Sequence, residues 1–126
     1  MAGLTLDSGA VIGYERGDLR VLAYLKETLE RGLPPTVPSV VIAETYRGGP
    51  RSARISRLLR FATTHDLDEA LARDAGELRG RCAGSTTIDA IVVASAATRS
   101  DAILTSDPGD IEVLAAHYPA VRVIAI

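Results

Sequence analysis

Four acidic residues lie next to or within apolar stretches of the sequence, where charged side chains are uncommon. Asp7 and Asp107 each directly follow an apolar run, "GLTL" and "AILTS" respectively. Glu44 lies within the apolar stretch "SVVIAETY", and Asp89 follows "STTI". Two unit charges about 4 Å apart repel by roughly 4 kcal/mol at an effective dielectric constant near 20. If these carboxylates meet in space, they must share a proton or bind a cation.

A site built only from carboxylates suits a hard divalent cation such as Mg²⁺ or Mn²⁺, which prefers oxygen ligands and keeps several bound waters. Such an ion polarises a phosphoryl oxygen and lowers the pKa of a bound water. The chemistry that this set of residues favours is therefore phosphodiester hydrolysis.

The elements that would position these acids alternate along the chain. The apolar patterns and turn residues predict alternating strands and helices. Ser39 is the expected N-cap of the third helix, and Gly32 is expected at the C-terminal end of the second. Thr86 or Thr87 is expected to cap the helix that contains Asp89. The expected strands are residues 3–6, 35–38, 64–67 (at a sheet edge), 101–106 and 120–126, and the expected helices are residues 8–18, 19–32, 40–48, 51–62, 68–84, 85–100 and 109–118.

This alternation predicts an α/β fold, with a mostly parallel sheet and helices on both faces. We expect residues 1–126 to form one domain, since no repeat or linker divides them. Ligands of such sheets bind beyond the carboxyl ends of the strands. Because the four acids follow strands or flank them, we expect all four at that edge, forming the active site.

Composition narrows the classes of protein further. The net charge of −2 argues against a protein held to nucleic acid by bulk positive charge. The single cysteine, Cys82, excludes an internal disulfide and a cysteine-based metal site, and we expect it to be buried as a small apolar side chain. Neither a signal peptide nor a membrane-spanning run is visible, so we expect a soluble, cytoplasmic protein.

Each acid also has an ordinary structural interpretation. Asp89 could be only a helix-start acid that complements the helix dipole, and Asp107 before Pro108 could be only a turn former. Asp7 could cap the turn that follows it. Glu44 is the hardest to explain by packing, because apolar residues precede it throughout its helix. The functional interpretation depends on the four residues taken together.

Four segments then carry a resemblance to a known family. "LDSGAVI", "PSVVIAETYRG", "TTIDAIVVASAA" and "AILTSDPGDIEVL" resemble the motifs of PIN domains, and more narrowly of VapC-type ribonuclease toxins from bacterial type II toxin–antitoxin systems. The resemblance extends over essentially the whole chain.

The resemblance implies an Mg²⁺- or Mn²⁺-dependent ribonuclease whose acidic quartet is Asp7, Glu44, Asp89 and Asp107. Within that quartet we expect Asp7 and Asp89 to contact the metal, Asp107 to complete its ligand shell, and Glu44 to orient or deprotonate the attacking water. The resemblance also implies RNA as substrate, a homodimer, and inhibition by a cognate antitoxin protein. The alternatives that remain open are a PIN-domain nuclease of RNA processing and a non-catalytic α/β binding module.

The chain departs from the family pattern at two places. The family often has Asp-Thr-Ser where this chain has Asp7-Ser8-Gly9, so the third hydroxyl is missing. Its last motif often continues with aspartate and phenylalanine, whereas here Asp110 is followed by isoleucine. We expect Asp107 inside the metal shell and Asp110 at its periphery. Ser106 and Ser8 are secondary candidates that could donate to a water or a phosphate, with turn formation as their alternative role.

One stretch, "RGGPRSARISRLLR", contains five arginines and no acid. Arginine matches phosphate oxygens well, so Arg47, Arg51 and Arg54 are candidates for binding the RNA backbone. The alternative is a solvated helix face.

Other α/β enzymes gather acids at a sheet edge but fit less well. A dehalogenase-like phosphatase has a second aspartate two residues after its nucleophile, and position 9 is glycine. A receiver domain needs a lysine near its last strand, and the only lysine is Lys26. A phosphate-binding P-loop or dinucleotide site is excluded because no suitable glycine–lysine motif occurs.

Overall fold

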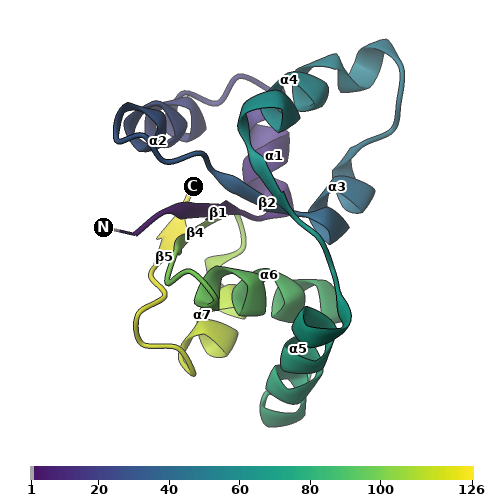
Figure 1. The fold of residues 1–126 in the computed structure, drawn as a ribbon, viewed down its shortest axis with the longest axis vertical. Coiled ribbons are helices and arrows are strands. Elements are labelled where there is room, and N and C mark those ends of the chain that lie inside the picture. Colours follow the sequence, from purple (N-terminus) through teal and green to yellow (C-terminus); the bar gives the residue numbers. More distant parts are fainter. Residues whose placement is uncertain (1) are drawn as a thin grey trace.

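The computed structural model describes residues 2–126 and contains one sheet of five parallel strands (Figure 1). The strand order is β3-β2-β1-β4-β5, and every neighbouring pair is parallel. The α/β prediction is therefore confirmed. The strands are β1 (Leu4–Leu6), β2 (Thr36–Pro38), β3 (Thr63–His65), β4 (Ala102–Thr105) and β5 (Val123–Ala125).

Helices cover both faces of this sheet, as its parallel connections require. In Figure 1, α1 to α4 lie on one face, and α5 to α7 lie on the other. The helices are α1 (Ser8–Glu15), α2 (Leu19–Glu30), α3 (Ser39–Thr45), α4 (Ala53–Phe61), α5 (Glu69–Arg81), α6 (Thr87–Ala97) and α7 (Pro108–Ala115), and a 3₁₀ turn, Pro50–Ser52, precedes α4.

The core lies where the central strands are covered from both sides. Leu6, Val37, Ile103 and Leu104 are completely buried. The continuous apolar character of β1 and β4 follows from this, because a strand with helices on both faces has no solvated side. The edge strand β3 is more exposed and contains polar residues. Cys82 is buried, as expected.

The structure corrects several local predictions. Ser39 is the first residue of α3 and not its N-cap; its hydroxyl accepts a hydrogen bond from Leu67 N at 3.1 Å, which ties α3 to the segment after β3. The expected helix 51–62 is a 3₁₀ turn followed by α4, and each of the other helices ends two or three residues before its predicted end. Gly32 does follow α2 with a φ of +75°, the conformation that favours glycine. In the described residues, no helix is long and apolar enough to cross a bilayer.

Candidate active site

Asp7 is placed at the carboxyl end of β1 by the sheet itself. Its backbone N–H donates to the Leu104 carbonyl at 3.1 Å, which extends the pairing of β1 with β4 beyond the strand. Its side chain is only 5% exposed. Oδ1 accepts from Ser8 N at 2.8 Å, and Oδ2 accepts from the buried Thr105 hydroxyl at 2.8 Å. Asp7 therefore caps α1 and also holds a fixed carboxylate at this edge of the sheet.

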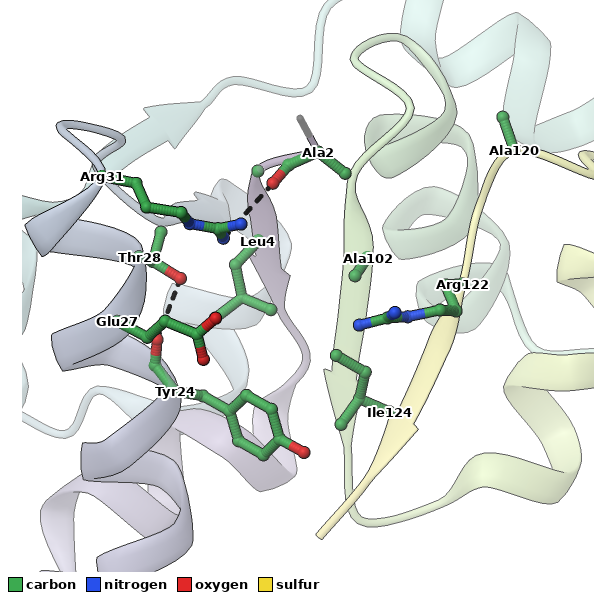
Figure 2. A pocket seen from close by; sticks show the side chains of 11 residues that line it. Ala2, Leu4, Tyr24, Glu27, Thr28, Arg31, Ala102, Ala120, Arg122 and Ile124 are labelled. Carbon is green, nitrogen blue, oxygen red and sulfur yellow. Dashed lines mark hydrogen bonds between the residues drawn. The ribbon is translucent and has the colours of Figure 1, made fainter.

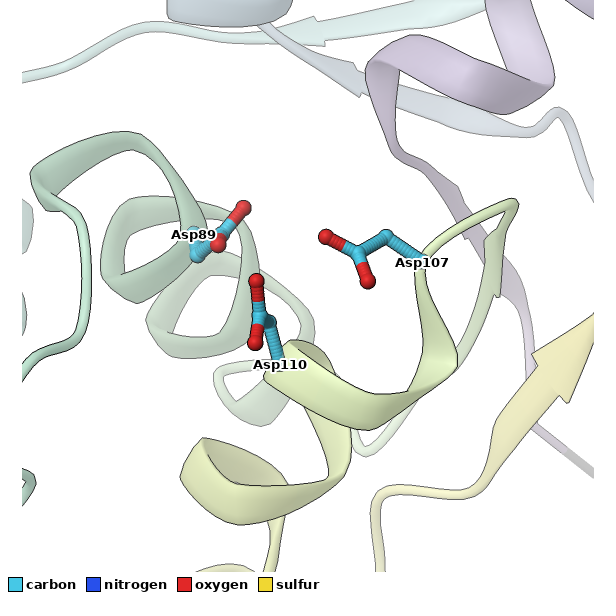
Figure 3. A group of neighbouring side chains, drawn as sticks. All are labelled: Asp89, Asp107 and Asp110. Atoms are coloured by element: carbon cyan, nitrogen blue, oxygen red, sulfur yellow. The ribbon is translucent and has the colours of Figure 1, made fainter.

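Three further carboxylates gather at the same edge (Figure 3). Asp89 lies in the first turn of α6, Asp107 directly precedes α7, and Asp110 lies in the first turn of α7. One oxygen from each lies within 4.8 Å of the other two. In Figure 3 the Asp89 and Asp107 side chains point toward each other across an open space, with that of Asp110 beside them.

The side chain of Asp107 does not cap its own helix. It is the N-cap residue of α7, yet its carboxylate accepts no capping hydrogen bond. Its backbone N–H donates to Thr105 Oγ1 at 2.9 Å. Since the turn is held by the backbone and by Pro108, the carboxylate is left exposed at the site and available to a ligand.

Glu44 contributes a carboxylate with an unusual environment. It lies in the last turn of α3, and its Oε1 is buried with no hydrogen-bond partner among the described residues. A buried oxygen of this kind loses its hydration without compensation, at a cost of about 1–3 kcal/mol. Such a group is retained where a proton, water or ion satisfies it.

The pKa values of these carboxyls show that their charges interact. The pKa of Glu44 is raised mainly because burial disfavours the charged form, and then because of the negative charges of Asp7 and Asp89. The pKa of Asp89 is raised mainly by burial; its hydrogen bond with Thr86 opposes this, and the charges of Asp7, Asp107 and Asp110 add to it.

The pKa of Asp107 is raised for a different principal reason. Its interaction with the Asp110 side chain favours the protonated form, burial and the charges of Asp110 and Asp7 act in the same direction, and the Asp110 backbone N–H opposes them. Three of these carboxyls therefore retain protons more strongly than free carboxyls do. A site of this kind is electrostatically prepared for a cation.

A family comparison decides which fold family this arrangement represents. The PIN-domain model matches residues 4–115, most of the chain. This chain belongs to the PIN-domain family. Members of the family are nucleases and generally use divalent metals, which supports hydrolase activity for this PIN domain. A comparison with curated proteins found no match.

Solved structures agree on the fold. This PIN domain is similar to a chain of DNA-bound VapBC2 from Rickettsia felis, with a TM-score of 0.76, 13% identity and 98% of each chain covered. It is also similar to a chain of a toxin–antitoxin complex from Klebsiella pneumoniae, with a TM-score of 0.73, 20% identity and coverage of 99% and 100%. A third is a chain of FitAcB from Neisseria gonorrhoeae, with a TM-score of 0.68, 20% identity and 96% of each chain covered. At these identities the likeness shows the fold.

The structure groups only some of the predicted site residues by distance. Asp89 and Asp107 lie together with Asp110, with one oxygen of each within 4.8 Å of the others, and neither Asp7 nor Glu44 belongs to that group. The charge of Asp7 still raises the pKa of Glu44, Asp89 and Asp107. Asp110, which we expected at the periphery, belongs to the same group as Asp89 and Asp107, within 4.8 Å. Its position therefore allows it to bind the same cation.

The two secondary serines take different positions. Ser8 donates its backbone N–H to Asp7 and begins α1, and its hydroxyl has no partner among the described residues. Ser106 is exposed between Thr105 and Asp107, and its side chain lies against Gly9. We call Asp89, Asp107 and Asp110 the acidic cluster. Ser106 directly precedes Asp107 of this cluster and lies against the first turn of α1.

The candidate arginines are less uniform than the sequence suggested. The Arg47 guanidinium is engaged with the carbonyls of Ala43, Glu44 and Tyr46, which satisfies the end of α3. Arg54 donates to the Glu15 carbonyl at 3.0 Å. Both are exposed but already partly bound to backbone oxygens. Arg51 is exposed, and its guanidinium makes no hydrogen bond within residues 2–126.

A separate pocket of about 290 Å³ lies at the opposite, amino-terminal ends of β1 and β4 (Figure 2). Arg31, Arg122 and Tyr24 contribute to its wall, but Glu27 is its only carboxylate within the described residues. Arg31 donates to the Ala2 carbonyl at 3.5 Å, and Thr28 donates to the Tyr24 carbonyl at 2.9 Å. One carboxylate cannot form a cation site like that of the acidic cluster, so this pocket is not an alternative site for metal-dependent hydrolysis.

Two residues next to the site were not predicted from the sequence. Thr105 holds Asp7 by its hydroxyl, and Arg16 lies after α1 in a pocket that also includes Ser106. A threonine near the end of a strand is common in any sheet, so its spacing gives no signal. Arg16 lies far from the arginine-rich stretch, and only the fold brings it near Ser106.

Proposed function

We propose that this PIN domain is an Mg²⁺- or Mn²⁺-dependent ribonuclease and the toxin of a toxin–antitoxin pair. The observation that carries the proposal is the group formed by Asp89, Asp107 and Asp110, whose carboxylate oxygens lie within 4.8 Å of one another, in a family of nucleases. Similar solved chains come from complexes described as toxin–antitoxin and VapBC assemblies, which supports the toxin role and a protein antitoxin as partner. A homodimer, expected from the family resemblance, remains part of the proposal.

The residues present fit a hard divalent cation. The donor set is entirely carboxylate oxygen, and Glu44 Oε1 is buried without a hydrogen-bond partner in the described chain. Asp7, Asp89 and Asp107 would hold the ion, with Asp110 beside them. A bound Mg²⁺ or Mn²⁺ supplies polarisation of the phosphoryl oxygen and a more acidic water.

The protein's own groups then have distinct roles. Thr105 fixes the Asp7 carboxylate from β4, so this ligand needs little reorganisation. Glu44, whose pKa is raised by burial and by Asp7 and Asp89, accepts the proton of the attacking water. The leaving oxygen takes a proton from solvent at the exposed side, where Asp107 and Asp110 lie.

The direct test is cleavage of single-stranded RNA by the purified protein with Mg²⁺, with Mn²⁺, and with EDTA. We expect cleavage only with metal, and a loss of about 100-fold or more in Asp7→Asn, because a lost ligand removes several kcal/mol of transition-state stabilisation. Asp74→Asn is the matched control, because Asp74 is exposed on α5 and its substitution removes the same charge away from the site. Equal rates for Asp7→Asn and the parent would refute the site.

The alternatives predict different results. A non-catalytic binding module would bind RNA without cleaving it in any metal. A nuclease of RNA processing would cleave RNA, but its expression would not arrest growth. For a toxin, induced expression should stop growth, and co-expression of the product of a short neighbouring reading frame should relieve the arrest.

A further inference from the structure

A pocket of about 310 Å³ is lined largely by residues of α1 and of the segment after it. Gly9 and Ser106 both contribute to its wall. Gly9 is two residues after Asp7, and Ser106 directly precedes Asp107. The pocket therefore contains close chain neighbours of two proposed metal ligands.

Ser106 is held in this pocket by close packing against Gly9. A Cβ atom placed on Gly9 would lie 1.9 Å from Ser106 Oγ and 2.7 Å from Ser106 Cβ. Only glycine at position 9 leaves room for the serine side chain there. The Ser106 hydroxyl makes no hydrogen bond within residues 2–126, and the residue is exposed. The fold thus fixes a hydroxyl beside the acidic cluster and leaves its hydrogen-bonding capacity unused.

The rest of the wall combines apolar and charged residues. Its charged side chains are those of Arg16, Asp18 and Arg20, beside Ile12, Gly13 and Ile126. Arg20 pairs with Asp18 at 3.2 Å, so these two charges largely cancel. Arg16 is exposed, and its guanidinium has no hydrogen-bond or ion-pair partner in the described part of the chain. Arg16 is therefore the unpaired charged side chain among the described residues that line this pocket.

We propose that this pocket is a subsite for the RNA backbone, in which Arg16 and Ser106 bind a phosphate group neighbouring the one that is cleaved. A guanidinium fork and a hydroxyl are donors that match phosphate oxygens. The carboxylates beside the pocket bind a cation and not a phosphate, so the two sites are complementary along one strand. This inference rests on the proposed ribonuclease function and assigns a substrate contact within it.

The test compares Arg16→Ala and Ser106→Ala with the parent in steady-state cleavage of one single-stranded RNA with Mn²⁺. We expect each variant to raise KM about 10-fold with a smaller change in kcat, since the lost contact exists before and during the reaction. Arg73→Ala is the matched control, because Arg73 is exposed and pairs only with Glu69 on α5. Unchanged KM in both pocket variants would overturn the subsite.

Salt dependence gives a second measurement that does not require cleavage. Binding of a fluorescent single-stranded RNA, measured by anisotropy in EDTA, should lose about 0.7 from its log–log salt slope in Arg16→Ala, as one phosphate contact predicts. Ser106→Ala should weaken binding without changing the slope, because serine carries no charge. An Arg16→Ala slope equal to that of Arg73→Ala would overturn the subsite. A parent that binds RNA through this pocket but never cleaves it would instead refute the proposed function alone.

Discussion

The hydroxyl of Thr105 connects the carboxylate of Asp7 to the backbone of Asp107, the two aspartates that follow neighbouring strands. It donates to Asp7 Oδ2 at 2.8 Å, and it accepts the backbone N–H of Asp107 at 2.9 Å. Thr105 is completely buried, and the register that pairs Leu6 with Leu104 places it beside Asp7. One side chain therefore sets the relative position of two proposed metal ligands.

Replacing Thr105 by valine should disturb both carboxylates. Valine keeps the shape but leaves Asp7 Oδ2 and the Asp107 N–H without their partner, which costs about 1–3 kcal/mol for a buried polar group. Urea unfolding should show this loss. Calorimetric titration should show about 10-fold weaker Mn²⁺ binding, as for other residues that orient metal ligands. Thr105→Ser keeps the hydroxyl and should stay near the parent. Parent-like Mn²⁺ affinity in Thr105→Val would contradict the positioning role.

The metal-free protein should lose stability as the pH rises through the weakly acidic range. Glu44, Asp89 and Asp107 have pKa values raised above their ordinary values of 4.5, 3.8 and 3.8. Between those values and the raised ones, the folded state binds more protons than the unfolded state, so the free energy of unfolding falls with increasing pH. The pKa of Asp18 is lowered from 3.8, so this residue changes the stability of the protein only at a lower pH.

Thermal unfolding in EDTA from pH 4 to pH 8 measures this effect. We expect Asp89→Asn to flatten the decline and to raise the melting temperature at pH 7 by about 4 °C, if roughly 1 kcal/mol of repulsion is removed. Mg²⁺ should stabilise the parent at pH 7 and have less effect at pH 4, where the carboxyls are protonated. Identical pH profiles for the parent and Asp89→Asn would show that the cluster does not govern stability.

The common location of the acids could be predicted from the sequence because it depends on topology alone. Once strands and helices alternate in a parallel sheet, residues such as Asp7 and Asp107, which directly follow strands, must lie at one edge. Glu44 was identified because its charge contradicts its apolar surroundings. These inferences need only the order of elements and the chemistry of single residues.

What could not be predicted depends on contacts between distant segments. The network of Arg99 with the buried residues Asp101, Thr5 and Ser95 joins residues up to 96 positions apart. The Thr105–Asp7 bond and the packing of Ser106 on Gly9 are of the same kind. Sequence periodicity specifies which face of an element is apolar, but not which side chain meets which across a loop.

Asp110 should contribute to metal binding about as strongly as Asp107. Both lie within 4.8 Å of Asp89 through at least one oxygen, and both are exposed at the site. Asp107→Asn and Asp110→Asn should each weaken Mn²⁺ binding about 10-fold in calorimetric titration, a loss of roughly 1.4 kcal/mol. Glu112→Gln, which removes an exposed charge from the same helix, serves as control. If only Asp107→Asn weakens binding, Asp110 is peripheral, as the sequence alone suggested.

Gly9 tests whether the contact with Ser106 governs local stability. Gly9 lies in α1, and its φ is outside the range that disfavours side chains, so helix propensity alone predicts that alanine stabilises by up to about 1 kcal/mol. Overpacking predicts the opposite sign, because the new Cβ would meet Ser106 Oγ at 1.9 Å, at a typical cost of about 1–3 kcal/mol. We expect the cost of overpacking to exceed the gain in helix propensity, so that Gly9→Ala unfolds at a lower urea concentration than the parent.

The double variant Gly9→Ala with Ser106→Gly separates these two effects. Removing the serine side chain eliminates the contacts at 1.9 and 2.7 Å and leaves only the one to the Ser106 backbone N at 3.0 Å. The double variant should therefore recover most of the stability that Gly9→Ala loses, a non-additive result expected of residues in direct contact. Additive losses in the urea experiment, or a Gly9→Ala protein more stable than the parent, would mean that Ser106 moves away freely and that the fold does not fix its hydroxyl.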